Sequence, residues 1–356
     1  MRFHRINNPK SIDEEMIAAL FSSGAQEVVL QFDDEADYNP NLLHAINTAC
    51  RRFGSRLTVR FYGHYTNGGR FNCAWLQHLP DVRSLSLDCL THIEGANRIA
   101  ELEHLEAFAF GVFESDIPEL LRYSSLAGVH KLILSETRKN NIDLAPLEAY
   151  QRLETLFLNA HARNIATLGD LATIRRLSLS QIAKRVSLRF VGRMLGLRSL
   201  TLLLGGRTSA EELAHPKIIH LEVLRVRAFA EISISMFPQL QVLRIEDQIK
   251  LLSLELNEGT LLRWLSIWNC KNFSNLPGLA HAVALESLSL GRTSLDPESV
   301  LNNTPPSLKR LVISGFGRRR NEELESRIRS KGYTPDIPDP TLEVSTRIDG
   351  PLDLQD

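Results

Sequence analysis

The stretch LRWLSIWNCKNFSNLPGLAHAVALESLSL (residues 262–290) decides the fold. It begins and ends on the same short pattern, in which aliphatic residues occupy the first, fourth and sixth positions. Between the two copies lies a segment with apolar residues of its own, at Phe273, Leu276 and Leu279. Since side chains alternate along a strand, each copy predicts a short strand with one apolar face, followed by a return segment.

The same pattern recurs from residue 82 to residue 313 with a steady period. Its copies begin at Val82, Leu105, Val129, Leu153, Ile174, Leu197, Leu221, Leu240, Leu262, Leu285 and Leu308. Successive starts lie 19 to 24 residues apart, which random aliphatic matches would not maintain. A single unit of this size cannot bury its apolar edge. Neighbouring units are therefore expected to stack, with their strands paired into a parallel sheet and their returns packed behind it.

With these eleven repeats, the chain resembles the leucine-rich repeat superfamily over about residues 82–314. The resemblance implies an α/β solenoid, a curved horseshoe with a parallel sheet on its concave face. It also implies a specific protein ligand. The chain departs from the family pattern three residues after the last aliphatic position, where Asn or Cys is usual. Only Cys270 matches there, so the backbone-bonding asparagine ladder is expected to be absent.

Both ends of the repeat array carry segments typical of caps. Before residue 82, a helix from Ser11 to Phe21 with a capping box at Ser11 and Glu14 precedes a strand over 27–32. Asn39 and Pro40 then open a helix that ends before Gly54, and a strand follows over 57–62. We therefore predict N-terminal capping units over 1–81, repeats over 82–316, a C-terminal cap helix within 317–332 and an acidic, proline-containing tail over 333–356.

Composition narrows the function. The chain has 356 residues, with 41 Lys and Arg against 42 Asp and Glu, so its formal charge is −1 and no global field attracts nucleic acid or an anionic membrane. The first residues lack the apolar core of a signal peptide, and no run reaches the ~20 apolar residues that span a bilayer. The four cysteines show no paired spacing. These features predict a cytoplasmic protein with free thiols.

The motifs of catalysis and cofactor binding are missing from the sequence. No HExxH, GxxxxGK[ST], GxGxxG or GxSxG motif occurs, and we predict no enzyme activity, no cofactor and no metal. Two clusters leave an alternative open. The acidic residues from Asp33 to Asp37 could hold a metal or a substrate, or form a solvated loop. The run from Arg318 to Arg320 could contact phosphate, or form the polar start of the cap helix.

The third, fifth and seventh residues of each copy should face away from the core. They are small in the first two copies and bulky in the middle, with Val223, Arg225 and Arg227, then Val242, Arg244 and Glu246, then Trp264, Ser266 and Trp268. Trp and Arg are enriched at binding hot spots. We therefore predict a protein-binding surface with an acidic partner region opposite it. Its residues are Arg225, Arg227, Arg244, Glu246, Trp264, Trp268, Phe157 and Arg176. The alternative is that the tryptophans pack internally against the arginines.

These observations predict a non-enzymatic binding protein that grips another protein on the concave face. Inhibitors, toxin-neutralising immunity proteins and adaptors are the roles that the resemblance implies. The alternative function is a secreted effector or a substrate-receptor subunit that recruits a host or cellular protein.

Overall fold

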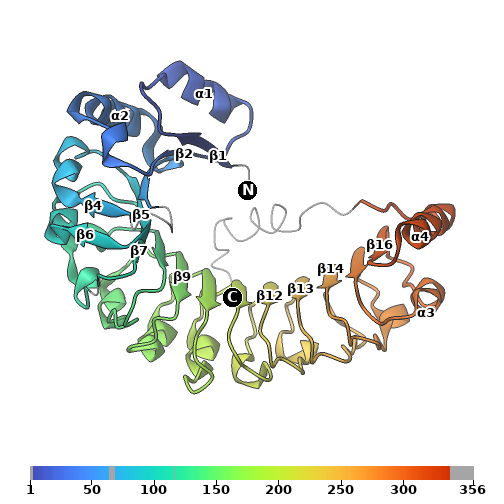
Figure 1. The fold of residues 1–356 in the computed structure, drawn as a ribbon. Helices are drawn as coiled ribbons and strands as arrows, with labels where there is room; N and C mark the ends of the chain where they lie inside the picture. The colour runs from blue at the N-terminus through green and yellow to red at the C-terminus, as the bar shows by residue number, and fades with distance from the viewer. Residues whose placement is uncertain (1–2, 64–68, 116, 337–356) are drawn as a thin grey trace, which may run out of the picture. The chain divides into compact units, whose positions relative to one another are not determined.

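The computed structural model describes residues 3–63, 69–115 and 117–336. Most of the tail predicted over 333–356 therefore lies outside the described residues. The chain divides into two compact units, Met1–Leu168 and Gly169–Asp356, here called the first unit and the second unit. Each unit is built on a parallel sheet with the returns behind it, so the predicted solenoid fold is confirmed (Figure 1).

The first unit contains a main parallel sheet in the order β1-β2-β3-β5-β7-β8-β9 and a small sheet of β4 and β6. Its strands are β1 (Phe3–Asn7), β2 (Glu27–Phe32), β3 (Leu57–Tyr62), β4 (Arg70–Asn72), β5 (Ser84–Leu90), β6 (His92–Glu94), β7 (Ala107–Val112), β8 (Lys131–Leu134) and β9 (Thr155–Asn159). Its helices are α1 (Glu14–Ser22) and α2 (Pro40–Phe53), and most of its other returns are short 3₁₀ turns.

The N-terminal segments match the sequence closely, with two exceptions. Strands β2 and β3 have the predicted bounds, and Asn39 caps α2 by accepting a hydrogen bond from the Leu42 amide at 3.0 Å. The capping box predicted at Ser11 is wrong, because Asp13 is the residue whose side chain accepts the Met16 amide. Strand β1 was not predicted, and it pairs in parallel with β2.

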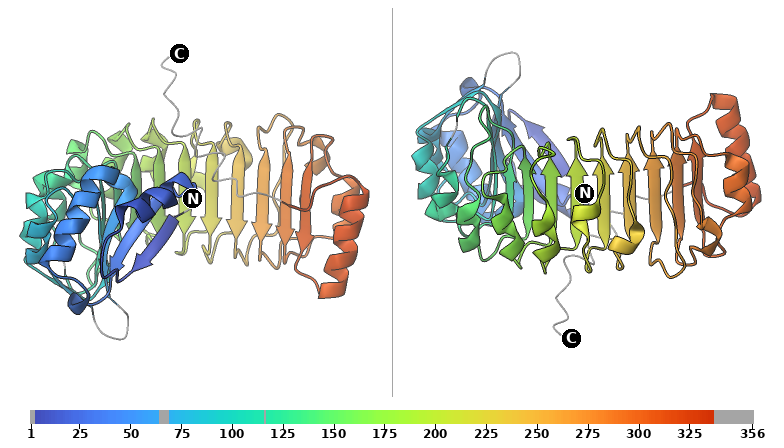
Figure 2. Two further views of the ribbon diagram at one scale, coloured as in Figure 1. Left: turned by 90° about the horizontal axis from the view of Figure 1, so that it is seen from above. Right: turned by 90° about the horizontal axis from the view of Figure 1, so that it is seen from below.

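The second unit contains a parallel sheet in chain order from β10 to β16. Its strands are β10 (Arg176–Ser180), β11 (Ser199–Leu203), β12 (His220–Leu224), β13 (Val242–Glu246), β14 (Trp264–Trp268), β15 (Ser287–Gly291) and β16 (Arg310–Ser314). Helix α3 (Pro297–Asn302) forms one return, and α4 (Arg318–Ser330) follows the last strand. Figure 2 shows these strands side by side and running in one direction, with α4 beyond β16.

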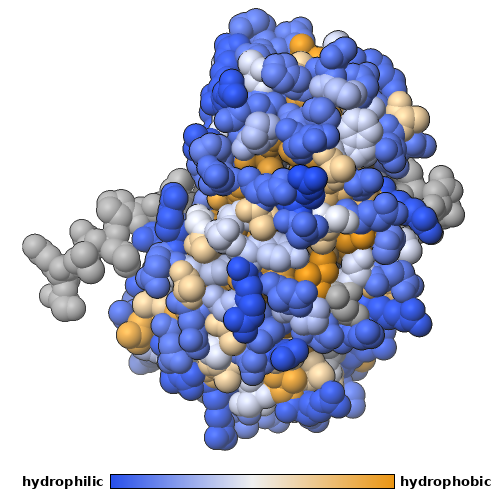
Figure 3. Space-filling model, turned by 90° about the vertical axis from the view of Figure 1, so that its left-hand side faces the viewer, coloured by the Kyte–Doolittle hydropathy of each residue, from blue (hydrophilic) through white to orange (hydrophobic). Residues whose placement is uncertain are grey.

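The core lies between the strands and the returns. In β14, Leu265 and Ile267 are buried, and Phe273 from the following return is fully buried with them. Burying one such side chain contributes about 1.5–3 kcal/mol, and the repeat supplies several of them per unit. On the side of the first unit that carries β4 and β6, hydrophilic side chains predominate and apolar groups show between them (Figure 3). The described residues contain no helix with the length and apolarity needed to cross a membrane.

Candidate protein-binding surface

The strand residues that point away from the core of the second unit form a continuous surface, here called the strand face. Each strand contributes its first, third and fifth residues, while the second and fourth residues are buried. In β13 the outward residues are Val242, Arg244 and Glu246, and in β14 they are Trp264, Ser266 and Trp268. Register pairs these residues directly across the two strands, so they lie about 4.8 Å apart in neighbouring rows.

The structure corrects the register predicted for β12. Leu221 pairs with Leu243 and Val223 with Ile245, and Val223 is fully buried. The repeat therefore begins at Ile218 rather than at Leu221. With this start, the two neighbouring spacings become 21 and 22 residues in place of 24 and 19. The outward residues of β12 are His220, Glu222 and Leu224.

Arg225 and Arg227 were predicted on the exposed face of this strand, and that placement is wrong. Both residues follow β12, in the turn that leaves the sheet. Arg225 has a left-handed backbone with φ of 56°, a conformation shared by the residue after every strand of the unit. These residues are Gln181, Leu204, Arg225, Asp247, Asn269, Arg292 and Gly315. The Arg225 amide donates to the Glu246 carbonyl at 2.9 Å, so the ladder continues one residue beyond the strand.

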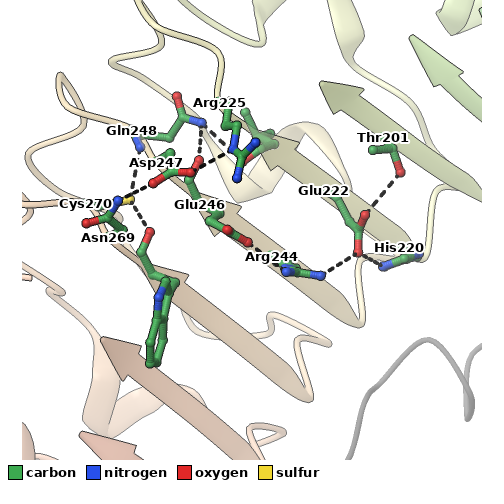
Figure 4. Close-up of polar contacts among 12 residues, drawn as sticks. Thr201, His220, Glu222, Arg225, Arg244, Glu246, Asp247, Gln248, Asn269 and Cys270 are labelled. Atoms are coloured by element: carbon green, nitrogen blue, oxygen red, sulfur yellow. Dashed lines mark hydrogen bonds and ion pairs between the residues drawn. The ribbon is translucent and has the colours of Figure 1, made fainter. Parts of the chain in front are cut away.

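A network of polar side chains crosses β11, β12 and β13 on the strand face, with Glu222 at its centre (Figure 4). One Glu222 carboxylate oxygen lies 3.4 Å from His220 Nε2 and 3.9 Å from Arg244 Nη1. Thr201 donates to the other oxygen at 3.4 Å. Arg244 in turn donates to Glu246 at 2.7 Å. The network holds Arg244 flat along the sheet between two carboxylates.

The surroundings of Glu222 lower its pKa. Burial acts in the opposite direction and raises the pKa, but the hydrogen bond and charge of His220, the charge of Arg244 and the Thr201 hydroxyl outweigh it. A carboxyl whose folded-state pKa lies below its unfolded value of about 4.3 stabilises the fold above that value. This contribution disappears as the pH falls through the folded-state pKa.

We therefore expect Glu222→Gln to lower the free energy of unfolding at pH 7 by about 1.5–3 kcal/mol, the range for hydrogen bonds to charged groups. The difference from the unsubstituted protein should shrink as the pH falls from about 4.3, the unfolded value, through the lower folded-state pKa, where the native carboxyl also becomes neutral. Urea unfolding at pH 7 and at low pH measures both values. Glu255→Gln, at an exposed position of the same unit, is the control and should change neither. A Glu222→Gln deficit that is equal at both pH values would contradict the assignment.

Carboxylates beside the arginines reduce the positive charge that the sequence predicted for this surface. Arg225 donates to Asp247 at 3.0 Å, and Arg244 lies between Glu222 and Glu246. The three carboxylates Glu222, Glu246 and Asp247 thus offset all but one of the four arginines of the predicted surface, which are Arg176, Arg225, Arg227 and Arg244. The prediction of an acidic partner region rested on the net positive charge of this surface, and most of that charge is offset.

Trp268 is the large aromatic side chain that the strand face exposes most clearly. It is 37% exposed, at the end of β14. Its register partner on β15 is Gly291, where an added Cβ would lie 2.1 Å from Trp268 Cε3. The indole therefore packs directly against the glycine backbone, and the side chain of any other residue at position 291 would clash with the ring. This seat fixes the ring and leaves one face of it open to solvent.

Trp264 is covered, in contrast to Trp268. It is only 6% exposed, because Val242 on β13 and Ile219 pack against it. Arg310 reaches across Ser287 and places its guanidinium 5.6 Å from the centre of the Trp264 ring. Trp264 therefore packs internally against an arginine, as the alternative interpretation of the sequence held. Trp268 is exposed, as the predicted binding surface required.

Two further predicted residues lie apart from this cluster. Arg176 is half-buried on β10, three strands from β13 in the same sheet. Phe157 is half-buried on β9 and belongs to the first unit. The structure thus brings together Arg244, Glu246, Trp264 and Trp268, with Arg225 beside them through Asp247.

Other buried polar groups take the place of the asparagine ladder after β13 and β14. Gln248 is fully buried, and its side-chain amide donates to the Glu246 carbonyl at 2.7 Å and to the Val223 carbonyl at 3.2 Å. Its backbone amide donates to Cys270 Sγ at 3.4 Å. Burial, partly offset by this hydrogen bond, raises the pKa of the Cys270 thiol to about 11. Gln248 and Cys270 therefore fix the turns that present Asp247 and Trp268.

The two charged clusters left open by the sequence have structural partners. Asp34 caps a 3₁₀ turn over Glu35–Asp37, and Glu35 accepts a hydrogen bond from Trp75 Nε1 at 2.7 Å. Arg318 and Arg319 lie within α4, where they pair with Glu322 and Glu323 one turn later. Among the residues that the structure describes, no group of three or more His, Cys, Asp or Glu is placed to hold a metal ion.

The sequence analysis did not identify the small outward residues of the first unit as a second candidate site. Ser84, Ser86, Ala107 and Ala109 line a cavity of about 270 Å³ on the strand side of that unit. The small size of these residues was the signal available in the sequence. Small residues form a cavity only where larger side chains surround them, and the sequence pattern alone does not show that arrangement.

No family model matches the chain, and no curated protein matches it. Among solved structures, it is similar to the Toll chain in the Drosophila Toll–Spatzle complex, with 12% identity and a TM-score of 0.47 over 96% of this chain and 49% of that one. It is also similar to a leucine-rich repeat protein of Leptospira interrogans, with 15% identity and a TM-score of 0.40 over 93% of each chain. The functional domain of InlJ from Listeria monocytogenes shares 14% identity and a TM-score of 0.39, over 86% of this chain and 67% of that one. The chain spans about half the length of the Toll chain.

Proposed function

We propose that this chain, a leucine-rich repeat protein by its repeats and its stacked parallel strands, binds another protein on the strand face of its second unit and catalyses no reaction. The observation that carries the proposal is the seat of Trp268. Exposure of the apolar indole ring to water is unfavourable, and a partner that covers the ring removes this penalty. The ring is also held rigid over Gly291, so binding requires little further ordering of the side chain. Rigid tryptophans of this kind are typical anchors of protein interfaces.

The polar network beside Trp268 supports the same proposal. Arg244 and Glu246 are partly exposed and lie in the row next to the tryptophan, held by hydrogen bonds to each other. A paired and oriented charge is ready to meet a polar group on a partner without rearrangement. Trp268 would supply the apolar contact, and Arg244, Glu246, Arg225 and Asp247 would form the polar rim. Because this rim carries both signs of charge, the partner should present both as well.

The test is capture of the partner from the native host, followed by measurement of its dissociation constant for two variants. Trp268→Ala should raise the dissociation constant about 30-fold or more, the loss typical of a hot-spot residue. Leu195→Ala removes an apolar side chain that is even more exposed, at 64%, from a return of the same unit, and it should leave binding unchanged. If both variants bind the partner as the unsubstituted protein does, the strand face is not the binding surface.

Inhibitor, immunity protein and adaptor are the roles that we propose for such a surface, within the cytoplasm. The four free cysteines, three of them buried, support a reducing compartment. The alternative role is a secreted effector or substrate-receptor subunit. The captured partner separates them: a toxin or enzyme that loses activity on binding supports inhibition, whereas a ligase or transport component supports the alternative.

A further inference from the structure

The cavity of about 270 Å³ in the first unit lies on its strand side and is here called the first-unit cavity. Five neighbouring strands form most of its lining, and β1 closes one end. Its lining residues include Phe3, Arg5, Glu27, Val29, Thr58, Arg60, Ser84, Ser86, Asp88, Ala107, Ala109, Lys131 and Ile133.

Differences in side-chain height create the first-unit cavity. Register places Ser84 beside Ala107 and Ser86 beside Ala109 on β5 and β7. Taller residues flank them in the same rows, with Arg60 on β3 and Ile133 on β8. Two adjacent strands with small side chains thus form a floor between two walls.

An ion pair closes over this floor. Lys131 Nζ on β8 lies 3.8 Å from Glu27 Oε2 on β2, although β3, β5 and β7 separate the two strands in the sheet. Four strand spacings measure about 19 Å along a flat sheet, which is more than two such side chains can span. The sheet of the first unit is therefore curved tightly enough for β2 and β8 to face each other across the cavity.

Two polar groups of the lining form no hydrogen bond or ion pair with the described residues. Ser86 is only 7% exposed, and its hydroxyl makes no hydrogen bond there while facing the cavity. Arg5 forms no ion pair in that part of the chain, and its guanidinium lies 4.8 Å from the centre of the Phe3 ring. The other charged groups are engaged, since Arg60 donates to Asp88 at 2.7 Å and Lys131 pairs with Glu27.

The Ser86 hydroxyl lines the cavity without a protein partner in the described part of the chain, so it is available to hydrogen-bond a ligand that enters. The lining also has one more cation than anions, and the unmatched cation is Arg5. Apolar groups make up much of the remaining lining, from Val29, Ile133, Ala107 and Ala109. Among the described residues, the cavity thus offers an unpaired cation at its solvent-exposed edge, one free hydroxyl and an apolar floor.

We propose that the first-unit cavity binds a small organic acid that has a compact apolar body of about ten non-hydrogen atoms. Arg5 holds its carboxylate, Ser86 donates a hydrogen bond to it, and the alanine floor and Ile133 contact the apolar body. The same chemistry is found in a free acid and in the C-terminal residue of a polypeptide. The site lies in the first unit, so it does not depend on the protein-binding surface proposed for the second unit.

Phenylacetate and its neutral analogue 2-phenylethanol provide the first test, with the full chain and ligand-observed NMR. Phenylacetate should bind at least tenfold more tightly than the alcohol, and 2-phenylethylamine should bind most weakly. Arg5→Ala should raise the phenylacetate dissociation constant tenfold or more, because a hydrogen bond to a charged group is lost. Ser86→Ala should raise it several-fold.

Ala109→Phe fills the floor and should abolish phenylacetate binding. Ser289→Phe places the same side chain at the matching position of β15 in the second unit, so it should leave binding unchanged. Undetectable phenylacetate binding by the unsubstituted protein would overturn the proposal, as would equal binding by Ala109→Phe or by Arg5→Ala. Arg5 is exposed, so Arg5→Ala should fold normally. Its phenylacetate affinity therefore tests the proposal even if Ala109→Phe fails to fold.

Peptides distinguish the two sources of the acid. A tetrapeptide that ends in a free phenylalanine carboxylate is compared with its C-terminal amide. Tighter binding of the free-acid peptide than of phenylacetate identifies a chain terminus as the ligand, whereas binding of phenylacetate alone identifies a free acid. If the amide binds as well as the acid peptide and phenylacetate does not bind, the proposed chemistry is wrong.

Discussion

Gly278→Ala is expected to lower the free energy of unfolding by about 3 kcal/mol or more. Gly278 has φ of +80°, a conformation that costs a residue with a Cβ about 1–2 kcal/mol. A Cβ there would also lie 1.8 Å from the Leu256 carbonyl oxygen of the preceding repeat. The two segments cannot simply part, since the Leu256 amide donates to the Pro277 carbonyl at 2.9 Å. Overpacking of this kind adds about 1–3 kcal/mol.

Gly259→Ala is the matched control for this prediction. Gly259 has a similar φ of +84°, but no atom lies within 4 Å of the Cβ that it would gain. It therefore measures the conformational cost alone, and we expect a loss of about 1 kcal/mol. Urea unfolding followed by far-ultraviolet circular dichroism provides both values. Equal losses for the two variants would show that the contact between neighbouring repeats at Gly278 is not as close as the structure has it.

The period of the sequence was sufficient to predict the stacking of repeats, because burial imposes the same pattern on every strand. Leu265 and Ile267 become buried only if neighbouring strands place apolar side chains at the matching positions. The apolar pattern therefore recurs at a constant period. Local signals were equally informative at α2, where Asn39 and Gly54 mark its two ends. Strand β1 was not predicted because its side chains are mostly exposed. Burial therefore imposes no alternation of apolar and polar residues on its sequence.

The register of β12 could not be read from its own residues. The aliphatic pattern fits with Ile218 as its first residue, followed by Leu221 and Val223. It fits equally well with Leu221 first, followed by Leu224 and Val226. A shift by three residues exchanges the two faces of a strand, since side chains alternate with a period of two. Only pairing with β11 and β13 decides between the alternatives, and it places Glu222 outside and Val223 inside.

The candidate sites depend on neighbours that are distant in the sequence. Trp264 and Trp268 lie at equivalent outward positions of one strand, yet Val242 covers the first and Gly291 leaves the second open. The first-unit cavity likewise depends on the curvature that brings Lys131 to Glu27. Relations of this kind follow from packing and curvature, which a one-dimensional pattern does not contain.

Val223→Asp tests the corrected register most directly, and we expect it to lower the free energy of unfolding by about 3–5 kcal/mol. Val223 is fully buried between the sheet and the returns, where an unpaired carboxylate loses its hydration. The register inferred from the sequence places the same residue on the exposed face, where an aspartate would cost less than about 0.5 kcal/mol. The two registers thus differ by several kcal/mol at one position.

Val283→Asp makes the same chemical change at a valine of the same unit that is 63% exposed, and it should alter the free energy of unfolding by less than about 0.5 kcal/mol. Urea unfolding of the two variants at pH 7 supplies the comparison, because the new carboxylates then carry the largest penalty for burial. A small loss for both would return Val223 to the surface and Glu222 to the interior. The network centred on Glu222 would then vanish, and the polar rim beside Trp268 would have to be rebuilt from Arg225 and Arg227.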